Sequence, residues 1–221
     1  MKPNFVIGID EVGRGALAGP VVVAALACKS ANQCKECRKG TLKDSKKLSA
    51  KQRETWYAHF ADHPGITFAV ARVYPRGIEK LNISQAANLA AYRALKRLKE
   101  RGARKKDEGR AIFRKQSMFG SQAIFLDGGL FLGNKKWQGV NHSSAKTMVK
   151  ADETIPAVAM ASIIAKVHRD GYMRRLAKKY SVYGFDIHKG YGTKAHYAAI
   201  KKHGFSKAHR LTFLKKHSII T

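Results

Sequence analysis

The chain has 221 residues, and its 43 Lys and Arg against 15 Asp and Glu give it a formal net charge of +28. A charge this one-sided destabilises the compact state by self-repulsion, so we expect a nucleic acid or another polyanion as partner rather than a basic surface that serves solubility alone. The hydrophobic fraction of 44% suffices for one substantial core with a small additional part. The sequence shows no secretory or membrane-spanning stretch, so we expect a cytoplasmic protein without a membrane partner.

The segment Phe5–Gly15, FVIGIDEVGRG, has the pattern of a buried strand that leads directly into a polar site. Its apolar start is followed by two adjacent carboxylates, Asp10 and Glu11. A buried carboxylate is costly unless it is paired, hydrogen-bonded or bound to metal, and ligands of open α/β folds collect at the carboxyl ends of strands. The segment therefore indicates a cation site, with a strand that ends in a polar turn as the alternative. The flanking glycines would let the backbone approach a ligand, and Arg14 offers a fork for phosphate.

Two further strands are predicted in the first third of the chain. Pro20–Lys29 and Ile66–Val73 are rich in β-branched and small apolar residues. Between them, Ser49 is expected to cap a helix that runs through Phe60 and ends at His63–Gly65. Because the first connection is too short for a crossover helix, the three strands should form an antiparallel meander.

The three cysteines, Cys28, Cys34 and Cys37, are expected to be free thiols in a reducing compartment. Cys34 and Cys37 form one C-x-x-C pair, but a structural zinc site usually needs a second pair of ligands. His59 and His63 have no spacing that would support such a site.

The rest of the chain is predicted to alternate helices with short strands. Ile78–Arg101 and Ile155–Lys179 have apolar residues at helical spacing, and Pro156 suits the first turn of the second helix. Ala123–Leu126 is a fourth strand, and Lys146–Ala151 is a weak fifth strand. Further expectations are a helix start at Asn82 or Ser84 and short helices near His196–His203 and Ser206–Leu214. The basic segment Gly102–Phe119 is expected to be either a flexible insertion or a loop that faces phosphate. Together these helices and strands predict an α/β fold with a mixed five-stranded sheet flanked by helices and a small helical C-terminal part.

Carboxylates follow three of the predicted strands: Asp10 with Glu11, Asp127, and Asp152. Strands of one sheet bring such ends together across sequence distance. Hard cations favour oxygen ligands, so Mg²⁺ or Mn²⁺ is indicated, and two such ions about 3.5–4 Å apart stabilise both attacking and leaving oxygens in phosphoryl transfer. A turn residue is the alternative for each Asp alone, and Glu153 competes with Asp152 because adjacent residues point in different directions.

Several motifs occur along most of the chain in one order, and DEVGRG and ASIIAK are the most specific of them. They are FVIGIDEVGRG, DSKKLS (Asp44–Ser49), LNISQA (Leu81–Ala86), LDGG (Leu126–Gly129), KADETIPAVAMASIIAKVHRD (Lys150–Asp170) and HKGYGTKAH (His188–His196). In these motifs the sequence resembles the type 2 ribonuclease H family, ribonuclease HII.

The resemblance implies a ribonuclease H-like fold and a metal-dependent endoribonuclease. Such an enzyme would hydrolyse the phosphodiester 5′ to ribonucleotides in RNA/DNA hybrids and in DNA duplexes with embedded ribonucleotides, leaving 5′-phosphate and 3′-hydroxyl ends. The family's four metal-binding carboxylates match Asp10, Glu11, Asp127 and Asp152. Two Mg²⁺ or Mn²⁺ ions are therefore expected during catalysis.

The resemblance also implies residues that recognise the ribonucleotide. Gly13, Arg14 and Gly15 match the segment that senses the ribose 2′-hydroxyl, where larger residues than glycine would block the approach of the sugar. Tyr191 matches the tyrosine that stacks near the junction where RNA becomes DNA. Packing is the alternative role for Tyr191.

Four residues in the shared motifs are expected near backbone phosphates: Lys47, Ser162, Lys166 and Arg169. Ser162 could instead be a small residue for helix packing. Lys166 and Asp170 have the i,i+4 spacing of an ordinary surface ion pair.

Residues 1–180 are expected to form the catalytic domain, and residues 181–221 a helical part that completes the substrate cleft. No additional N-terminal substrate-binding domain is seen, which argues against the type 3 relative, and the tail LTFLKKHSIIT has no clear sliding-clamp motif. We expect a monomer. Two other classes stay open: a non-catalytic nucleic-acid-binding protein, which charge alone would allow, and another nuclease of the same superfamily, such as a junction resolvase, which the carboxylates alone would allow.

Overall fold

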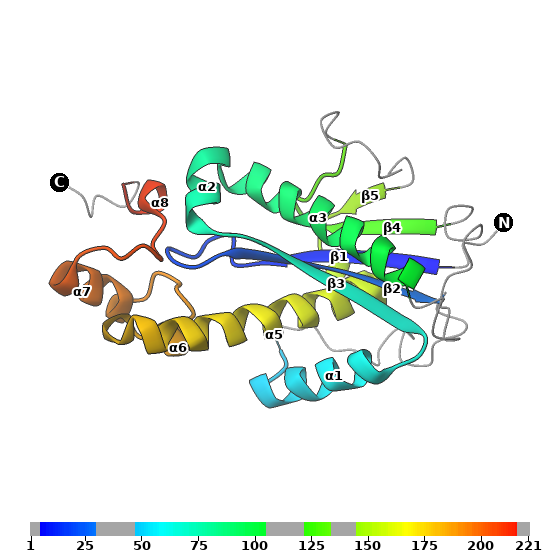
Figure 1. Ribbon diagram of the computed structural model, residues 1–221, viewed down its shortest axis with the longest axis horizontal. Helices are drawn as coiled ribbons and strands as arrows, with labels where there is room; N and C mark the ends of the chain where they lie inside the picture. Colours follow the sequence, from blue (N-terminus) through cyan, green and yellow to red (C-terminus); the bar gives the residue numbers. More distant parts are fainter. Residues whose placement is uncertain (1–4, 30–46, 105–121, 134–144, 216–221) are drawn as a thin grey trace.

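The computed structural model describes residues 5–29, 47–104, 122–133 and 145–215, and it shows a five-stranded sheet covered by helices on both faces (Figure 1). The strands are β1 (Phe5–Val12), β2 (Val21–Lys29), β3 (Ile66–Val73), β4 (Gln122–Asp127) and β5 (Ala145–Met148), in the spatial order β3-β2-β1-β4-β5. This confirms the expected mixed sheet. Cys34 and Cys37, most of Gly102–Phe119 and the end of the tail lie outside the described residues, whereas Cys28 is a buried free thiol.

The pairing of β1 with its two neighbours determines which of its residues lack a strand partner on the β4 side. β1, β2 and β3 form the predicted antiparallel meander, and β1 pairs with β2 along its whole length, up to Val12 opposite Val22. β4 runs parallel to β1 on the other side, but that pairing stops at Ile9 opposite Leu126. Asp10 is therefore the first residue of β1 beyond its parallel partner.

Local sequence signals account for where the long helices begin. Ser49 and Gln52 form a reciprocal capping box at the start of α1, as predicted from Ser49. Asn82 has a φ of 64° and accepts a hydrogen bond from the Gln85 N–H, so the predicted helix from residue 78 is two helices, α2 and α3. The main helices are α1 (Ala50–Asp62), α2 (Pro75–Leu81), α3 (Ile83–Arg104) and α5 (Pro156–Lys179). The short ones are α4 (Ala151–Thr154), η3 (Ser181–Tyr183), α6 (Phe185–His188), α7 (Lys194–His203) and α8 (Leu211–Lys215).

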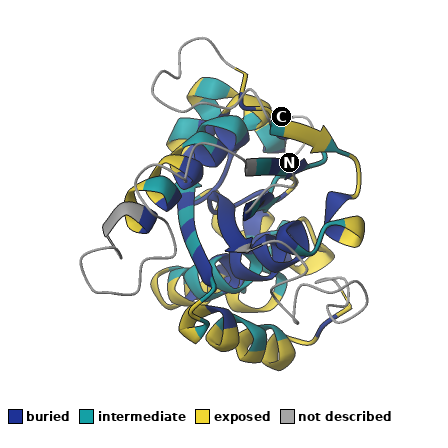
Figure 2. Ribbon diagram, turned by 90° about the vertical axis from the view of Figure 1, so that its right-hand side faces the viewer, coloured by how far each residue is buried: buried dark blue, intermediate teal, exposed yellow. Residues whose placement is uncertain are grey.

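The hydrophobic core has one layer on each face of the sheet. Alternate residues of β1 and β2 face α3 on one side, and the intervening residues face α5 and α1 on the other. The buried strands lie between partly exposed helices in Figure 2. None of the helices in the described ranges is both long and apolar enough to cross a membrane.

Gly8 allows α5 to approach β1 unusually closely. A Cβ atom at residue 8 would lie 2.1 Å from the backbone carbon of Ala157, in the first turn of α5. No side chain larger than hydrogen fits in that space, so the backbones of strand and helix are in direct contact there.

The C-terminal part packs against the loop that follows β1. A third buried cluster joins Leu17 and Ala18 of that loop to Met173 of α5, Phe185 of α6 and Leu214 of α8. The loop and the C-terminal part are also connected by an isolated β-bridge at Ala18, and α8 is tied to α2 through a hydrogen bond from its N-terminal backbone to Glu79.

Two buried histidines in the C-terminal part form an ordered hydrogen-bond chain. His209 Nδ1 accepts the Ser206 N–H at 2.9 Å, so a neutral His209 carries its proton on Nε2 and donates it to His196 Nε2 at 3.2 Å. His196 then carries its proton on Nδ1 and donates to the Tyr191 carbonyl at 2.9 Å. Burial lowers the pKa of both imidazoles to about 4. A second proton on either ring would place two N–H groups face to face.

This chain predicts a loss of stability in mild acid. The unfolded pKa of histidine is near 6.5, so the unfolded chain binds protons as the pH falls from 6.5 toward 4 while folded His196 and His209 do not. The free energy of unfolding is then highest above pH 6.5, and it falls by up to about 3 kcal/mol per histidine by pH 4. Denaturant unfolding at several pH values measures this. A His196→Gln variant should show a shallower dependence, and an identical slope in the two proteins would contradict the assignment.

Candidate active site

The first carboxylates of the site come from neighbouring strands. Asp10 and Glu11 lie in β1 beyond its pairing with β4, and Asp127 is the last residue of β4. Since the two strands are parallel, their carboxyl ends open at the same edge of the sheet. Asp10 is only 5% exposed there, so its charge needs a specific partner.

Asp152 reaches the same place from a short helix, and its predicted position at the end of a strand is wrong. β5 stops before it, Lys150 turns the chain with a φ of 55°, and Asp152 lies in the first turn of α4. The N–H of Ala151 donates to Asp127 Oδ1 at 2.7 Å, so the end of β4 fixes the start of this helix. Asp152 is buried, whereas Glu153 is exposed and pairs with Lys150 at 3.4 Å. Of these two adjacent acids, only Asp152 lines the site.

Asp10, Asp127 and Asp152 form a carboxylate triad in which each residue offers an oxygen within 4.8 Å of the others. Burial and then the charge of Glu11 raise the pKa of Asp10 well above its usual range, and a hydrogen bond from Ser162 acts against this. A cation among the three carboxylates would relieve their repulsion. Because all donors are oxygens, the residues fit a hard divalent cation such as Mg²⁺ or Mn²⁺.

Glu11 lies beside the triad with one oxygen unused. Its Oε1 is 3.3 Å from Arg14 Nη1, and its Oε2 is buried without a hydrogen-bond partner in the part of the chain that the structure describes. Burial raises the pKa of Glu11, and Arg14 acts in the opposite direction. A buried acceptor without a donor is costly, so this oxygen also fits a cation.

The loop Gly13–Gly15 forms the next wall of the site, and its two glycines differ in the space that a side chain would have. Gly13 has a φ of +88°, and a Cβ atom there would lie 2.1 Å from Arg169 Nε, inside the protein. Gly15 is exposed, and a Cβ atom there would meet nothing within 4 Å. Arg14 between them is also hydrogen-bonded to Ser84 Oγ at 3.3 Å.

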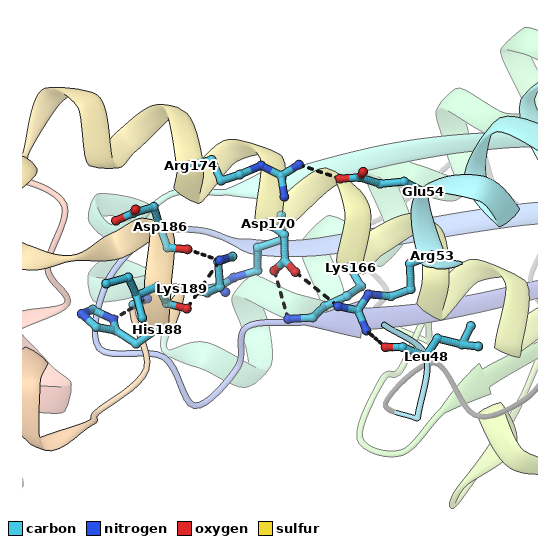
Figure 3. Close-up of polar contacts among 12 residues, drawn as sticks. Leu48, Arg53, Glu54, Lys166, Asp170, Arg174, Asp186, His188 and Lys189 are labelled. Carbon is cyan, nitrogen blue, oxygen red and sulfur yellow. Dashed lines mark hydrogen bonds and ion pairs between the residues drawn. The ribbon is translucent and has the colours of Figure 1, made fainter. Parts of the chain in front are cut away.

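The carboxylate triad, Glu11 and the loop Gly13–Gly15 line one cavity of about 390 Å³. Lys166 of α5 also reaches it while forming the ion pair with Asp170, at 2.9 Å, that was the alternative role for this lysine (Figure 3). Asp170 is shared with Arg53 of α1, 3.8 Å away. The cavity is lined by Asp10, Glu11, Val12, Gly13, Arg14, Gly15, Asp127, Asp152, Ser162, Lys166 and Tyr191.

Two predicted substrate contacts lie outside the cavity. Lys47 is exposed just before α1, and its phosphate role stays a prediction. Arg169 is fully buried, and it donates to the carbonyls of Pro20 and Ala18 at 3.2 Å each. Its guanidinium is enclosed by the protein, and the position of Arg169 near a backbone phosphate stays a prediction. The guanidinium lies over the ring of Tyr191, 5.2 Å from the centroid.

Arg210 supports the site although no sequence signal identifies it. Its buried guanidinium donates to the carbonyls of Gly13 and Arg14 at 2.8 Å each. In the sequence it is one of 43 basic residues and stands in a basic tail. Nothing local distinguishes it from a surface cation.

Comparison with known proteins shows one family to which this chain is similar. A family model described as ribonuclease HII matches residues 7–220. The ribonuclease HII of Endomicrobium trichonymphae is 39% identical over 98% of this chain and 88% of its own length. That of Bacteroides fragilis (strain YCH46) is 38% identical over 93% of this chain and 87% of its own length.

Solved structures show the same fold at lower identity. The ribonuclease H2 of Pyrococcus horikoshii has a TM-score of 0.69 at 24% identity, and the match covers 97% of this chain and 96% of that one. Bst-RNase HIII, solved in complex with Mn²⁺, has a TM-score of 0.71 at 22% identity, over 99% of this chain and 70% of that one. The expected ribonuclease H-like fold is thereby confirmed.

The carboxylate triad predicts that divalent cations stabilise the fold. An ion that binds only the folded state contributes about 2.7 kcal/mol at a free concentration 100 times its Kd, which corresponds to a rise in Tm of roughly 5–10 °C. Thermal unfolding with Mg²⁺, with Mn²⁺ and with a chelator measures this. Asp10→Asn should abolish the rise, and Asp62→Asn, an exposed acid of α1, should keep it. Equal rises in the two variants would place the ions elsewhere.

Proposed function

The chain belongs to the ribonuclease HII family and is a ribonuclease H endonuclease, and we propose that it uses divalent cations to cut the phosphodiester on the 5′ side of a ribonucleotide within a duplex. The substrates would be RNA/DNA hybrids and DNA duplexes with embedded ribonucleotides. The products would carry a 5′-phosphate on the ribonucleotide and a 3′-hydroxyl upstream. The observation that carries this proposal is a carboxylate triad and a glycine loop in one cavity.

Asp10, Asp127 and Asp152 would hold a cation, and the unused oxygen of Glu11 is available for a second. Divalent cations at such a site lower the pKa of an attacking water and stabilise the departing 3′-oxygen. The Mn²⁺ complex of the related Bst-RNase HIII supports Mg²⁺ or Mn²⁺ as the ion. The protein itself contributes orientation: backbone N–H groups of Glu11 and Ala151 each donate to a carboxylate oxygen of the triad at 2.7 Å.

Cationic and aromatic groups would hold the substrate over the triad. Lys166 and Arg14 both line the cavity, where their charges would attract backbone phosphates. Tyr191 offers its ring for stacking on a sugar or base, and the hydrogen bond from His196 to its backbone carbonyl restrains it. Positioning of this kind lets a protein accelerate phosphoryl transfer with little covalent chemistry of its own.

Selection of the cleavage position requires recognition of one hydroxyl group. The 2′-hydroxyl is what distinguishes RNA from DNA at a given site, and it both donates and accepts hydrogen bonds. The loop Gly13–Gly15 presents backbone beside the triad without a bulky side chain at either glycine. Backbone groups of this loop would therefore contact the ribose next to the scissile phosphate.

Asp10→Asn should abolish cleavage while duplex binding is retained, because it removes a metal ligand and leaves the cationic groups in place. Loss of a residue that only hydrogen-bonds to a metal ligand lowers activity by about 10–100-fold. Asp10 is expected to be a ligand itself, so we expect the cleavage rate to fall by more than about 100-fold. The assay is cleavage of a DNA duplex with one ribonucleotide, with and without Mg²⁺, beside an all-DNA duplex. Asp62→Asn is the control. Near-normal turnover in Asp10→Asn, or wild-type cleavage of the all-DNA duplex, would refute the proposal.

Gly15→Val tests the glycine loop without disturbing the fold. Crowding of the sugar was expected at both glycines, but a side chain at Gly13 would point toward Arg169, so only residue 15 has open space in front of it. We expect Gly15→Val to lower kcat/KM by about 10–200-fold, the range that a single methylene group produces in a pocket. Valine adds three carbon atoms, so the upper end of this range is expected.

The unfolding temperature separates the two glycine positions. Gly15→Val should leave Tm close to that of the wild type, whereas Gly13→Val should lower it, because its Cβ atom would overlap Arg169 Nε. Unchanged cleavage by Gly15→Val would remove the loop from recognition of the sugar.

A further inference from the structure

Arg210 is a fully buried cation at the junction between the C-terminal part and the loop after β1. It forms no ion pair with a carboxylate among the residues that the structure describes, and Glu79 is the carboxylate whose charge raises its pKa. Burial, and then the charge of Arg169, lowers the pKa of Arg210 to about 9, so it stays protonated at neutral pH. A buried guanidinium without a counter-ion is expensive, and its hydrogen bonds must account for its presence.

The hydrogen bonds of Arg210 all end on backbone carbonyls of one segment. Nη2 donates to Gly13 at 2.8 Å, Nη1 to Arg14 at 2.8 Å and Nε to Gly19 at 3.0 Å. The rigid fork of a guanidinium donates from separate nitrogens in fixed directions, whereas the three donors of a lysine ammonium share one nitrogen at the end of a flexible chain. Arg210 thus fixes two consecutive peptide planes of the loop Gly13–Gly15.

The orientation of these peptide planes determines where the loop presents its donors. No cis peptide bond occurs among the described residues. In a trans peptide the C=O of one residue and the N–H of the next point in opposite directions. Because the carbonyls of Gly13 and Arg14 point inward to Arg210, the N–H groups of Arg14 and Gly15 point away from it. Neither N–H has an acceptor within the described ranges, and both residues line the cavity.

Arg169 supports the same segment from a second direction. Its guanidinium occupies the space that a side chain at Gly13 would need, and it donates to the carbonyls of Ala18 and Pro20. Two buried cations thus lie behind residues 13–20, and the hydrogen bonds that they form with the described residues end on carbonyls of this segment. Because the guanidiniums bind the carbonyls from behind, the N–H groups of Arg14 and Gly15 are left free on the cavity side of the loop.

We propose that Arg210 is a positioning residue that turns the N–H groups of Arg14 and Gly15 toward the ribose 2′-hydroxyl. The inference rests on the proposed function of the loop and adds the group that sets its geometry. Arg210 touches neither substrate nor metal ligand and acts only through the backbone that it holds.

The test compares Arg210→Lys with Leu214→Ala. Lysine keeps the positive charge, but its donors all sit on one nitrogen and cannot reproduce the separate contacts that Nε, Nη1 and Nη2 of Arg210 make to three carbonyls. Leu214 is a fully buried apolar residue of the same junction and packs in the cluster of Leu17 and Met173. The measurements are kcat and KM on the single-ribonucleotide duplex, and Tm for each protein. We expect Arg210→Lys to lower kcat by 10- to 100-fold with KM changed less than threefold. Leu214→Ala should lower Tm by at least as much and keep kcat.

These outcomes separate positioning from a structural role. If kcat of folded Arg210→Lys stays within threefold of the wild type, or if both variants lose kcat in proportion to Tm, the inference is refuted. If the wild-type protein does not cut the ribonucleotide duplex at all, the proposed function fails first, and that result is distinct from the failure of Arg210 alone.

A measurement on protein that keeps Arg210 covers the case in which Arg210→Lys does not fold. The amide resonances of Arg14 and Gly15 are followed by NMR in Asp10→Asn protein, which should bind without cutting. They should shift with a ribonucleotide-containing duplex and not with the matched all-DNA duplex. Equal shifts with the two duplexes would show that these N–H groups do not face the hydroxyl, and would overturn the inference.

Discussion

Repulsion among the carboxylates of Asp10, Asp127 and Asp152 is the constraint on which the rest of this structure depends. The parallel pairing of β1 with β4 brings the first two together, and the hydrogen bond from Ala151 to Asp127 brings the third. Backbone N–H donors orient the oxygens of Asp10 and Asp127 without neutralising them. A fold that holds like charges this close and this deeply is strained until a cation joins them. The proposed chemistry therefore follows from the electrostatic need of the site itself.

The excess of basic residues has two different uses in this molecule. Among the residues that the structure describes, most lysines and arginines are at least partly exposed and suit a polyanionic partner, but Arg169 and Arg210 are fully buried. Their partners are carbonyl oxygens, which accept hydrogen bonds but carry no net charge. Both guanidiniums therefore keep their charge directly behind the glycine loop. Binding of carbonyls orders the loop, and the uncompensated charge adds a positive potential on the side where a phosphate would approach.

Features that depend on neighbouring residues could be predicted from the sequence, and features that depend on distant ones could not. The capping box at Ser49, the start of α5 at Pro156 and the meander of the first three strands follow from local signals. The position of Asp152 depends on a contact across 24 residues, and the burial of Arg169 on one across 151. The acids could be proposed as a metal site because strand ends converge, whereas the role of Tyr191 came from family resemblance, since one aromatic residue carries no spacing signal.

The contact between Gly8 and the first turn of α5 has a consequence for the dimensions of the site. Gly8 lies two residues before Asp10, and α5 carries Ser162 and Lys166 into the same cavity. The separation of β1 from α5 is thus also the separation of the carboxylates from the groups that face them. A single methyl group at residue 8 would widen the cavity by moving its two walls apart, without touching any residue that lines it. The width of the cavity is therefore set by the absence of a side chain at Gly8, on the buried face of the sheet.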